Sequence, residues 1–145
     1  MRTLNNIISM NCIILAMLLA NCLSTGCAPG ISYEGIDSIK ITFVNKGITT
    51  PFSVSCSGFE GYFSETYKKI TITDSLIIGN INKCLQSNTT AGLTSSIDVR
   101  GKMYLVRKNE VIAVYCYDRT GTFQLNDKDF FKNKCLADLI DQHIK

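Results

Sequence analysis

The sequence predicts an α+β domain, in which an antiparallel sheet of about five strands carries two or three helices packed on one face. Two kinds of periodicity support this prediction. Apolar and polar residues alternate over 38–44 and over 95–108, which is typical of half-buried strands. Apolar residues recur every three or four positions over 75–87 and over 134–144, which is typical of helices that bury one side.

The first predicted strand covers 38–44, where isoleucine and phenylalanine alternate with lysine and threonine. A turn follows, and the alternation resumes over 52–56, so these two strands are expected to form a β-hairpin. Aromatic residues at helical spacing within 57–69 predict a short helix, and the sequence ITIT at 70–73 predicts a brief further strand.

The best-defined helix is predicted over 75–87. Asp74 stands directly before it, where a carboxylate can accept hydrogen bonds from the first free backbone N–H groups. A single apolar stripe runs along this helix and consists of Ile77, Ile81, Cys84 and Leu85. A second amphipathic helix is predicted over 134–144.

The strongest strand pattern lies in 95–108, which places on one face Ile97, Val99, Met103 and Leu105. A turn leads to 111–118, which is apolar on both faces and is therefore predicted to be a central strand. After another turn, 122–125 completes a predicted three-stranded antiparallel meander. The following segment, 126–135, is predicted to be an irregular connection.

The beginning of the sequence has the features of an export signal. Arg2 precedes an apolar run over 7–20 that is shorter than the roughly 20 residues of a membrane-spanning helix. The run has instead the length of the apolar region of a signal peptide. The sequence LSTGC at 23–27 follows, and it resembles the lipobox of bacterial lipoproteins, in which an aliphatic residue and small residues precede a cysteine.

In that family a diacylglycerol is attached to the cysteine thiol as a thioether, and the signal peptide is cut off directly before this cysteine. The resemblance therefore implies cleavage between Gly26 and Cys27 and lipidation of Cys27. Ala28 follows, and because this position holds no aspartate, the same resemblance favours the outer membrane. The implied location is the bacterial cell envelope, with the membrane as a partner through the N-terminal lipid.

The chain is expected to have three parts, of which only the first is defined by the resemblance. Residues 1–26 are expected to be a lipoprotein signal peptide, and 27–37, which contain proline and glycine, are expected to be a flexible tether. Residues 38–145 are expected to fold as a single α+β domain, since their number is typical of one domain.

Charge and cysteine content limit the possible functions. Without 1–26 the chain keeps 14 of its 15 lysines and arginines, because Arg2 is lost, against 12 acidic residues. This near balance gives no reason to expect a nucleic-acid partner. Four cysteines in the expected domain form two disulfides or remain as buried thiols, and they are Cys56, Cys84, Cys116 and Cys135.

The sequence contains no recognisable catalytic, metal-binding or cofactor-binding set. His143 is the only histidine, and we expect it to be an ordinary helix-end residue. Asp127 and Asp129 alternate as in a calcium-binding loop, but the glycine and the glutamate that complete such a loop are missing. We therefore expect no catalytic residue, no metal and no cofactor.

A candidate interaction face is predicted instead. The polar side of the 95–108 strand and the strand facing it carry charged and aromatic side chains, which are common in protein interfaces. The residues are Asp98, Arg100, Tyr104, Tyr115, Tyr117 and Arg119. The alternative is ordinary cross-strand pairing on a solvated or helix-covered sheet.

Together these patterns predict a lipid-anchored cell-envelope protein with a non-enzymatic binding domain of an inhibitor, immunity or accessory type. Its expected partner is an envelope protein. The alternative is a small envelope hydrolase that uses carboxylates, although the sequence singles out no pair of carboxylates for that chemistry.

Overall fold

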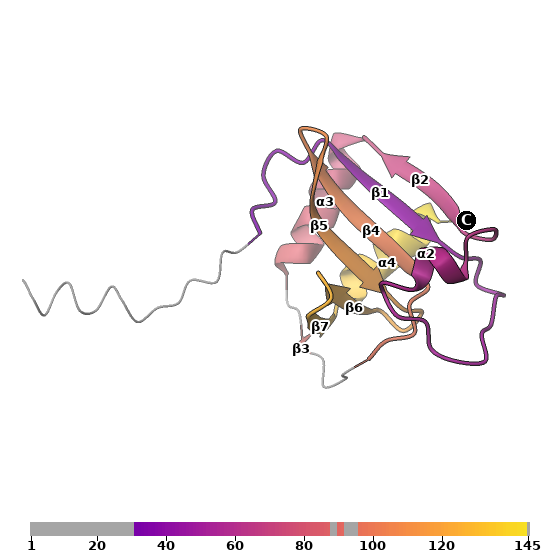
Figure 1. The fold of residues 1–145 in the computed structure, drawn as a ribbon. Helices are drawn as coiled ribbons and strands as arrows, with labels where there is room; N and C mark the ends of the chain where they lie inside the picture. Colours follow the sequence, from indigo (N-terminus) through magenta and orange to yellow (C-terminus); the bar gives the residue numbers. More distant parts are fainter. Residues whose placement is uncertain (1–30, 88–89, 92–95, 145) are drawn as a thin grey trace, which may run out of the picture. The chain divides into compact units, whose positions relative to one another are not determined.

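A seven-stranded antiparallel sheet forms the centre of the fold, with the strand order β2-β1-β4-β5-β6-β7-β3 (Figure 1). The structure is a computed structural model that describes residues 31–87, 90–91 and 96–144. The strands are β1 (Ser38–Phe43), β2 (Lys68–Ile72), β3 (Thr90–Ala91), β4 (Gly101–Arg107), β5 (Glu110–Tyr117), β6 (Thr122–Leu125) and β7 (Asp129–Lys132). The helices are α2 (Phe59–Tyr62), α3 (Ser75–Gln86) and α4 (Lys134–His143). The predicted α+β class is therefore confirmed.

Helices cover both faces of the sheet rather than one. Figure 1 shows α3 and α4 behind the sheet and α2 in front of it. Ile41 of β1 and Met103 of β4 stand directly opposite each other and are fully buried. Ile81 of α3 and Leu136 of α4 are also fully buried. Removal of these side chains from water stabilises the layer that contains the two longer helices.

A second core lies on the other face of the sheet, at α2. Its buried residues are Val44, Val54, Cys56, Phe59, Phe63, Ile97, Val99 and Cys116. Cys116 belongs to β5, whereas most of the other members come from the 44–63 segment. Burial of apolar side chains therefore holds this loop-rich segment on the sheet.

The predicted hairpin between 38–44 and 52–56 is wrong, because β1 pairs with β2 on one side and with β4 on the other. The backbone of Val54 forms its hydrogen bonds elsewhere. Its carbonyl accepts from the Val99 N–H at 2.9 Å, and its N–H donates to a carboxylate oxygen of Asp98 at 3.0 Å. A side chain thus replaces one of the backbone acceptors that a strand would use.

Two further segments differ from the prediction. β4 begins at Gly101 rather than near residue 95, and before it the Arg100 carbonyl accepts a hydrogen bond from the Val44 N–H at 3.0 Å. The predicted irregular connection contains β7, which makes the sheet larger than the five strands expected. Asn126 and Asp127 have φ values of 47° and 62°, and this left-handed pair turns the chain sharply from β6 into β7.

Asp74 caps α3 as predicted. One of its carboxylate oxygens accepts hydrogen bonds from the N–H groups of Leu76 and Ile77 at 2.8 Å and 3.2 Å. The buried residues of α3 are Ile78, Ile81, Cys84 and Leu85. The buried stripe therefore contains Ile78 in place of the predicted Ile77, and Ile77 is only half-buried.

The four domain cysteines form two disulfides. Cys56 bonds to Cys116 with their Cα atoms 5.7 Å apart, and Cys84 bonds to Cys135 with their Cα atoms 5.5 Å apart. The first bond fastens the segment before α2 to β5, and the second joins α3 to α4. The two bonds interleave along the chain, since each closes a loop that contains one end of the other.

The last residues of the predicted tether are held by the folded unit, which spans Tyr33–Lys145. The hydroxyl of Tyr33 lies 2.9 Å from the hydroxyl of Tyr115, and the side chain of Asn82 donates to the Tyr33 carbonyl at 3.1 Å. Asp37 accepts a hydrogen bond from the N–H of Lys108. These contacts place Tyr33 and Asp37 with the domain rather than in a flexible tether.

The predicted signal peptide, 1–26, and the predicted lipidated residue, Cys27, lie outside the described residues. Within the ranges that the structure describes, no helix combines the length and the apolar character needed to cross a membrane. Lipidation at Cys27 therefore stays a prediction.

Candidate functional site

The predicted interaction face is divided between the two sides of the sheet. Tyr104 stands opposite Val114, whereas Tyr115 stands opposite Met103, so these two tyrosines point to opposite faces. Tyr117 shares the face of Tyr115, and both are buried, with exposed fractions of 6% and 1%. The prediction that all three tyrosines share an exposed face is therefore wrong, because alternation along each strand does not define the register between β4 and β5.

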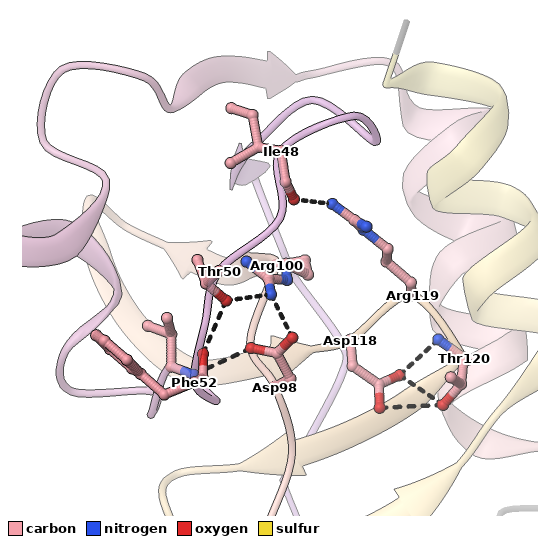
Figure 2. A network of polar contacts seen from close by, with 9 residues as sticks. Ile48, Thr50, Phe52, Asp98, Arg100, Asp118, Arg119 and Thr120 are labelled. Carbon is pink, nitrogen blue, oxygen red and sulfur yellow. Dashed lines mark hydrogen bonds and ion pairs between the residues drawn. The ribbon is translucent and has the colours of Figure 1, made fainter.

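Asp98 and Arg100 bind each other and the 44–63 segment (Figure 2). Nη2 of Arg100 donates to the Thr50 hydroxyl at 2.6 Å and forms an ion pair with the Asp98 carboxylate. The guanidinium carbon lies 5.6 Å from the centre of the Phe63 ring, and only 7% of the Arg100 side chain is exposed. Nη2 of Arg100 and the carboxylate of Asp98 are thus used within the protein.

Arg119 lies apart from this pair, in the turn between β5 and β6. Its side chain donates to the carbonyl of Ile48 (Figure 2). The neighbouring Asp118 accepts hydrogen bonds from the N–H groups of Thr120 and Thr122 at 2.7 Å and 2.9 Å. The turn is therefore closed by its own side chain and presents Arg119 at the surface.

Glu60 of α2 forms a second polar cluster with the sheet. Both of its carboxylate oxygens lie 2.8 Å from Nζ of Lys102, and the Tyr104 hydroxyl donates to one of them at 2.5 Å. Partial burial raises the pKa of Glu60, but the hydrogen bonds from Lys102 and Tyr104 outweigh this effect and leave its pKa below the ordinary value. Burial, and then the bond to Glu60, raise the pKa of Tyr104, so its phenol stays protonated and donates.

Replacing Glu60 by glutamine is expected to make the stability less sensitive to acid. Because folding lowers the pKa of Glu60, its charged form stabilises the fold above its ordinary pKa of 4.5, and this contribution is lost as the pH falls through the folded value. From about pH 6 to about pH 3, the free energy of unfolding should fall more steeply for the wild type than for Glu60→Gln. Urea unfolding at each pH measures both slopes, with Glu65→Gln, at an exposed glutamate, as the control. Equal slopes for wild type and Glu60→Gln would contradict this assignment.

Next to this cluster, one sheet face forms a groove of about 250 Å³. We call it the lysine–tyrosine groove, and define it by Lys40, Tyr67, Lys69, Thr71 and Tyr104. Lys40 and Lys69 are exposed, and Nζ of Lys69 lies 5.1 Å from the centre of the Tyr67 ring. Within the part of the chain that the structure describes, neither lysine forms an ion pair with a carboxylate. The groove is therefore a positively charged surface with aromatic walls.

A separate cavity of about 130 Å³, which we call the α4 cavity, lies between the β5–β6 turn and α4. Its charged and polar walls are formed by Lys46, Arg100, Tyr117, Asp118, Arg119 and Asp141. Nζ of Lys46 lies 2.9 Å from a carboxylate oxygen of Asp141. Val44, Ala137, Ile140 and Ile144 supply apolar walls. The α4 cavity thus combines charged groups of both signs with an apolar surface.

Sequence reasoning missed most residues of these two surfaces. The alternation over 38–44 does place Lys40 on the polar side of its strand, so that residue could have been found. Lys46, Arg119 and Asp141 come from separate segments, and only the folded chain brings them to one cavity. Among the residues of the predicted interaction face, Tyr104 lines the lysine–tyrosine groove, whereas Arg100, Tyr117 and Arg119 line the α4 cavity.

The sequence predicts that the acidic residues after β6 and the histidine bind no metal. Asp127 and Asp129 are exposed, and His143 is half-buried in the last turn of α4. Among the described residues, no three histidine, cysteine, aspartate or glutamate side chains gather closely enough to hold a metal ion.

Comparison with known proteins assigns the chain to no family. No protein-family model, no curated protein sequence and no solved structure matches it. The groove, the cavity and the disulfides are therefore the features of the molecule that bear on its function.

Proposed function

We propose that this chain is a lipid-anchored protein of the bacterial cell envelope whose domain binds an acidic partner protein and catalyses no reaction. The observation that carries the proposal is the lysine–tyrosine groove. Glu60 is the one carboxylate among the described residues that line it, and Lys102 already pairs with this carboxylate at 2.8 Å. Lys40 and Lys69 therefore offer uncompensated positive charge to an acidic surface.

The aromatic rings beside these lysines suit a protein as the partner. Tyr67 and Tyr104 are half-buried, so each presents part of a rigid ring to solvent. Tyrosine is enriched in protein interfaces because it combines a large apolar surface with a polar end. Since Glu60 already fixes the hydroxyl of Tyr104, binding would cost little further ordering of that side chain.

The two disulfides support an envelope location. Disulfides persist in oxidising compartments and are rare where cellular thiols are kept reduced. The lipobox-like sequence LSTGC independently implies export and lipidation at Cys27. An anchor with two or more acyl chains holds a protein firmly to a membrane. The partner is therefore expected within the envelope.

The carboxylates near the two surfaces favour binding over hydrolysis. Glu60 is held by Lys102 and Asp98 by Arg100. The two carboxylates that line the α4 cavity are also engaged, Asp118 by backbone N–H groups of its own turn and Asp141 by Lys46. A carboxylate-dependent glycoside hydrolase needs two carboxyl groups that face the same substrate, one as acid and one as base or nucleophile. Carboxylates that are held in separate internal contacts are poorly suited to that arrangement.

The proposal is tested by cross-linking in intact cells, followed by purification of the full chain from solubilised membranes. The charge reversal Lys40→Glu with Lys69→Glu is expected to lower recovery of the cross-linked partner about tenfold or more, because like charges then face each other. The wild-type complex should also weaken as salt is added, since salt screens exposed charges. In the same preparation, the intact mass should equal that of residues 27–145 plus acyl chains.

The matched control reverses two exposed lysines away from the groove, Lys128→Glu with Lys132→Glu. It should leave recovery of the partner unchanged, and both double variants should unfold at the temperature of the wild type. Undiminished recovery with the groove reversed would contradict binding at this surface. An intact mass without acyl chains would contradict the lipid anchor.

A further inference from the structure

We infer that the α4 cavity binds a small carboxylate that carries a compact apolar group. The cavity and the lysine–tyrosine groove have no lining residue in common, so this inference is independent of the proposed partner. It rests on two buried donors without acceptors, on an arginine without a carboxylate, and on the size and apolar walls of the cavity.

Two side chains of the cavity carry a buried donor that has no acceptor among the described residues. These donors are Nη1 of Arg100 and the hydroxyl of Tyr117. Nη2 of Arg100 is bonded to Thr50 and Asp98, so the missing acceptor concerns Nη1 alone. Burial, and then the negative charge of Asp141, raise the pKa of Tyr117, so its phenol stays protonated. Native proteins leave few such donors unpaired, so an acceptor is expected from water or from a ligand in the cavity.

The three cations of the α4 cavity differ in whether a carboxylate pairs with them. Lys46 is paired with Asp141 at 2.9 Å, and Arg100 is paired with Asp98. Arg119 forms no ion pair with a carboxylate in the part of the chain that the structure describes. With Asp98 and Asp118 counted, three carboxylates balance the three cations of the cavity, so a ligand is favoured by the guanidinium of Arg119, which has no carboxylate partner, and not by an excess of positive charge.

Arg119 is held in a position where it can meet such a ligand. Its side chain donates to the Ile48 carbonyl, and its neighbour Asp118 is directed toward Thr120 rather than toward the arginine (Figure 2). Asp118 also accepts from the N–H of Thr122, so its charge is engaged in the turn. A guanidinium can bind a carboxylate or a phosphate through two parallel hydrogen bonds, and the small volume and apolar walls of the cavity favour the carboxylate.

The remaining walls define the rest of the ligand. Val44, Ala137, Ile140 and Ile144 form an apolar surface within the cavity. Its volume of about 130 Å³ is close to that of the roughly 150 Å³ engineered cavity that accepts benzene in another protein. A phenyl or short branched alkyl group fits this size. A free small acid and an apolar C-terminal residue of a polypeptide both present this chemistry.

The test is a titration of the isotope-labelled full chain in detergent micelles, followed by nuclear magnetic resonance. The ligands are isovalerate, benzoate and acetyl-alanyl-leucine, each compared with its carboxamide. Saturable shifts of the Gly121 and Ala137 backbone signals are expected with the carboxylates. The carboxamides should bind about tenfold more weakly, because they lack the charge that pairs with arginine. If only the free acids bind, or only the peptide, that result identifies whether the ligand is a small acid or the end of a polypeptide. If neither binds, the inference is overturned.

Three variants and one control separate a ligand-binding role from a structural one. Tyr117→Phe removes an unpaired hydroxyl, so the unfolding temperature should stay the same or rise, whereas carboxylate binding should weaken about threefold. Arg119→Gln, at an exposed position, should weaken binding about tenfold, and the control Lys128→Gln should have no effect. Ala137→Leu should abolish binding by filling the cavity. Unchanged carboxylate affinity in both Tyr117→Phe and Arg119→Gln would overturn the inference.

Discussion

Replacing Cys56 and Cys116 together with alanine is expected to lower the free energy of unfolding by about 4 kcal/mol. Their disulfide joins residues that are 60 positions apart, and a cross-link over that distance strongly restricts the unfolded chain. Both cysteines are buried beside Phe59 and Val99 in the core at α2, so the bond also secures the 44–63 segment. Equilibrium unfolding in urea, followed by circular dichroism, measures the loss.

The second disulfide provides the comparison for this experiment. Cys84 and Cys135 are 51 positions apart, so the same argument gives a similar loss of about 4 kcal/mol when both become alanine. Because the two closed loops overlap along the chain, each disulfide already shortens the loop that the other must close, so removal of both should cost more than the sum of the two single losses. A loss below about 1 kcal/mol for the Cys56 and Cys116 variant would contradict this account of the cross-link.

Gly101→Ala is expected to destabilise the protein by about 3 kcal/mol, because the new methyl group has no space. A Cβ atom at Gly101 would lie 2.7 Å from Cε1 of Tyr117 and closer still to the end of that ring. Tyr117 is buried and its ring centre lies 5.8 Å from that of Phe123, so the ring can withdraw only toward the α4 cavity that it lines. Thermal and urea unfolding of the single variant measure the effect.

Gly79→Ala is the matched control for this substitution. No atom lies within 4 Å of a Cβ at Gly79, so alanine should raise the free energy of unfolding by up to about 1 kcal/mol through its better helix propensity. Tyr117→Leu added to Gly101→Ala should recover part of the loss, because the two positions are in contact. A loss below about 0.5 kcal/mol for Gly101→Ala alone would show that the tyrosine moves freely.

The elements that the sequence predicted well are those whose local pattern and tertiary contacts agree. β1 alternates cleanly and is a strand, and α3 begins at its predicted cap, Asp74. The segment 52–56 alternates equally well but is not a strand, because Val54 bonds to a side chain and to a distant backbone group. β7 was missed because a left-handed turn, which the pattern of 126–135 did not reveal, returns the chain to the sheet.

The candidate surfaces could be predicted only in part, for a related reason. Alternation placed Tyr104 on the polar side of its strand, where it does lie, together with Lys40 of β1 directly opposite. The same reasoning put Tyr115 and Tyr117 on that side, but the register of β5 against β4 places both on the other face. Register depends on how two strands meet, so it was not available from either strand alone.

The position of β1 inside the sheet also has a consequence for how long the chain takes to assemble. Ile41 pairs with Ile70 of β2 and with Met103 of β4, which are 29 and 62 positions further along the chain. At a synthesis rate of about 5–20 residues per second, β4 is made roughly 3–12 s after β1. Until then β1 and β2 can form only a two-stranded ribbon, which is marginal in water. The delay between the arrival of β1 and that of β4 in the compartment where the chain folds is therefore the minimum time for which the apolar row of β1 lacks its second neighbour.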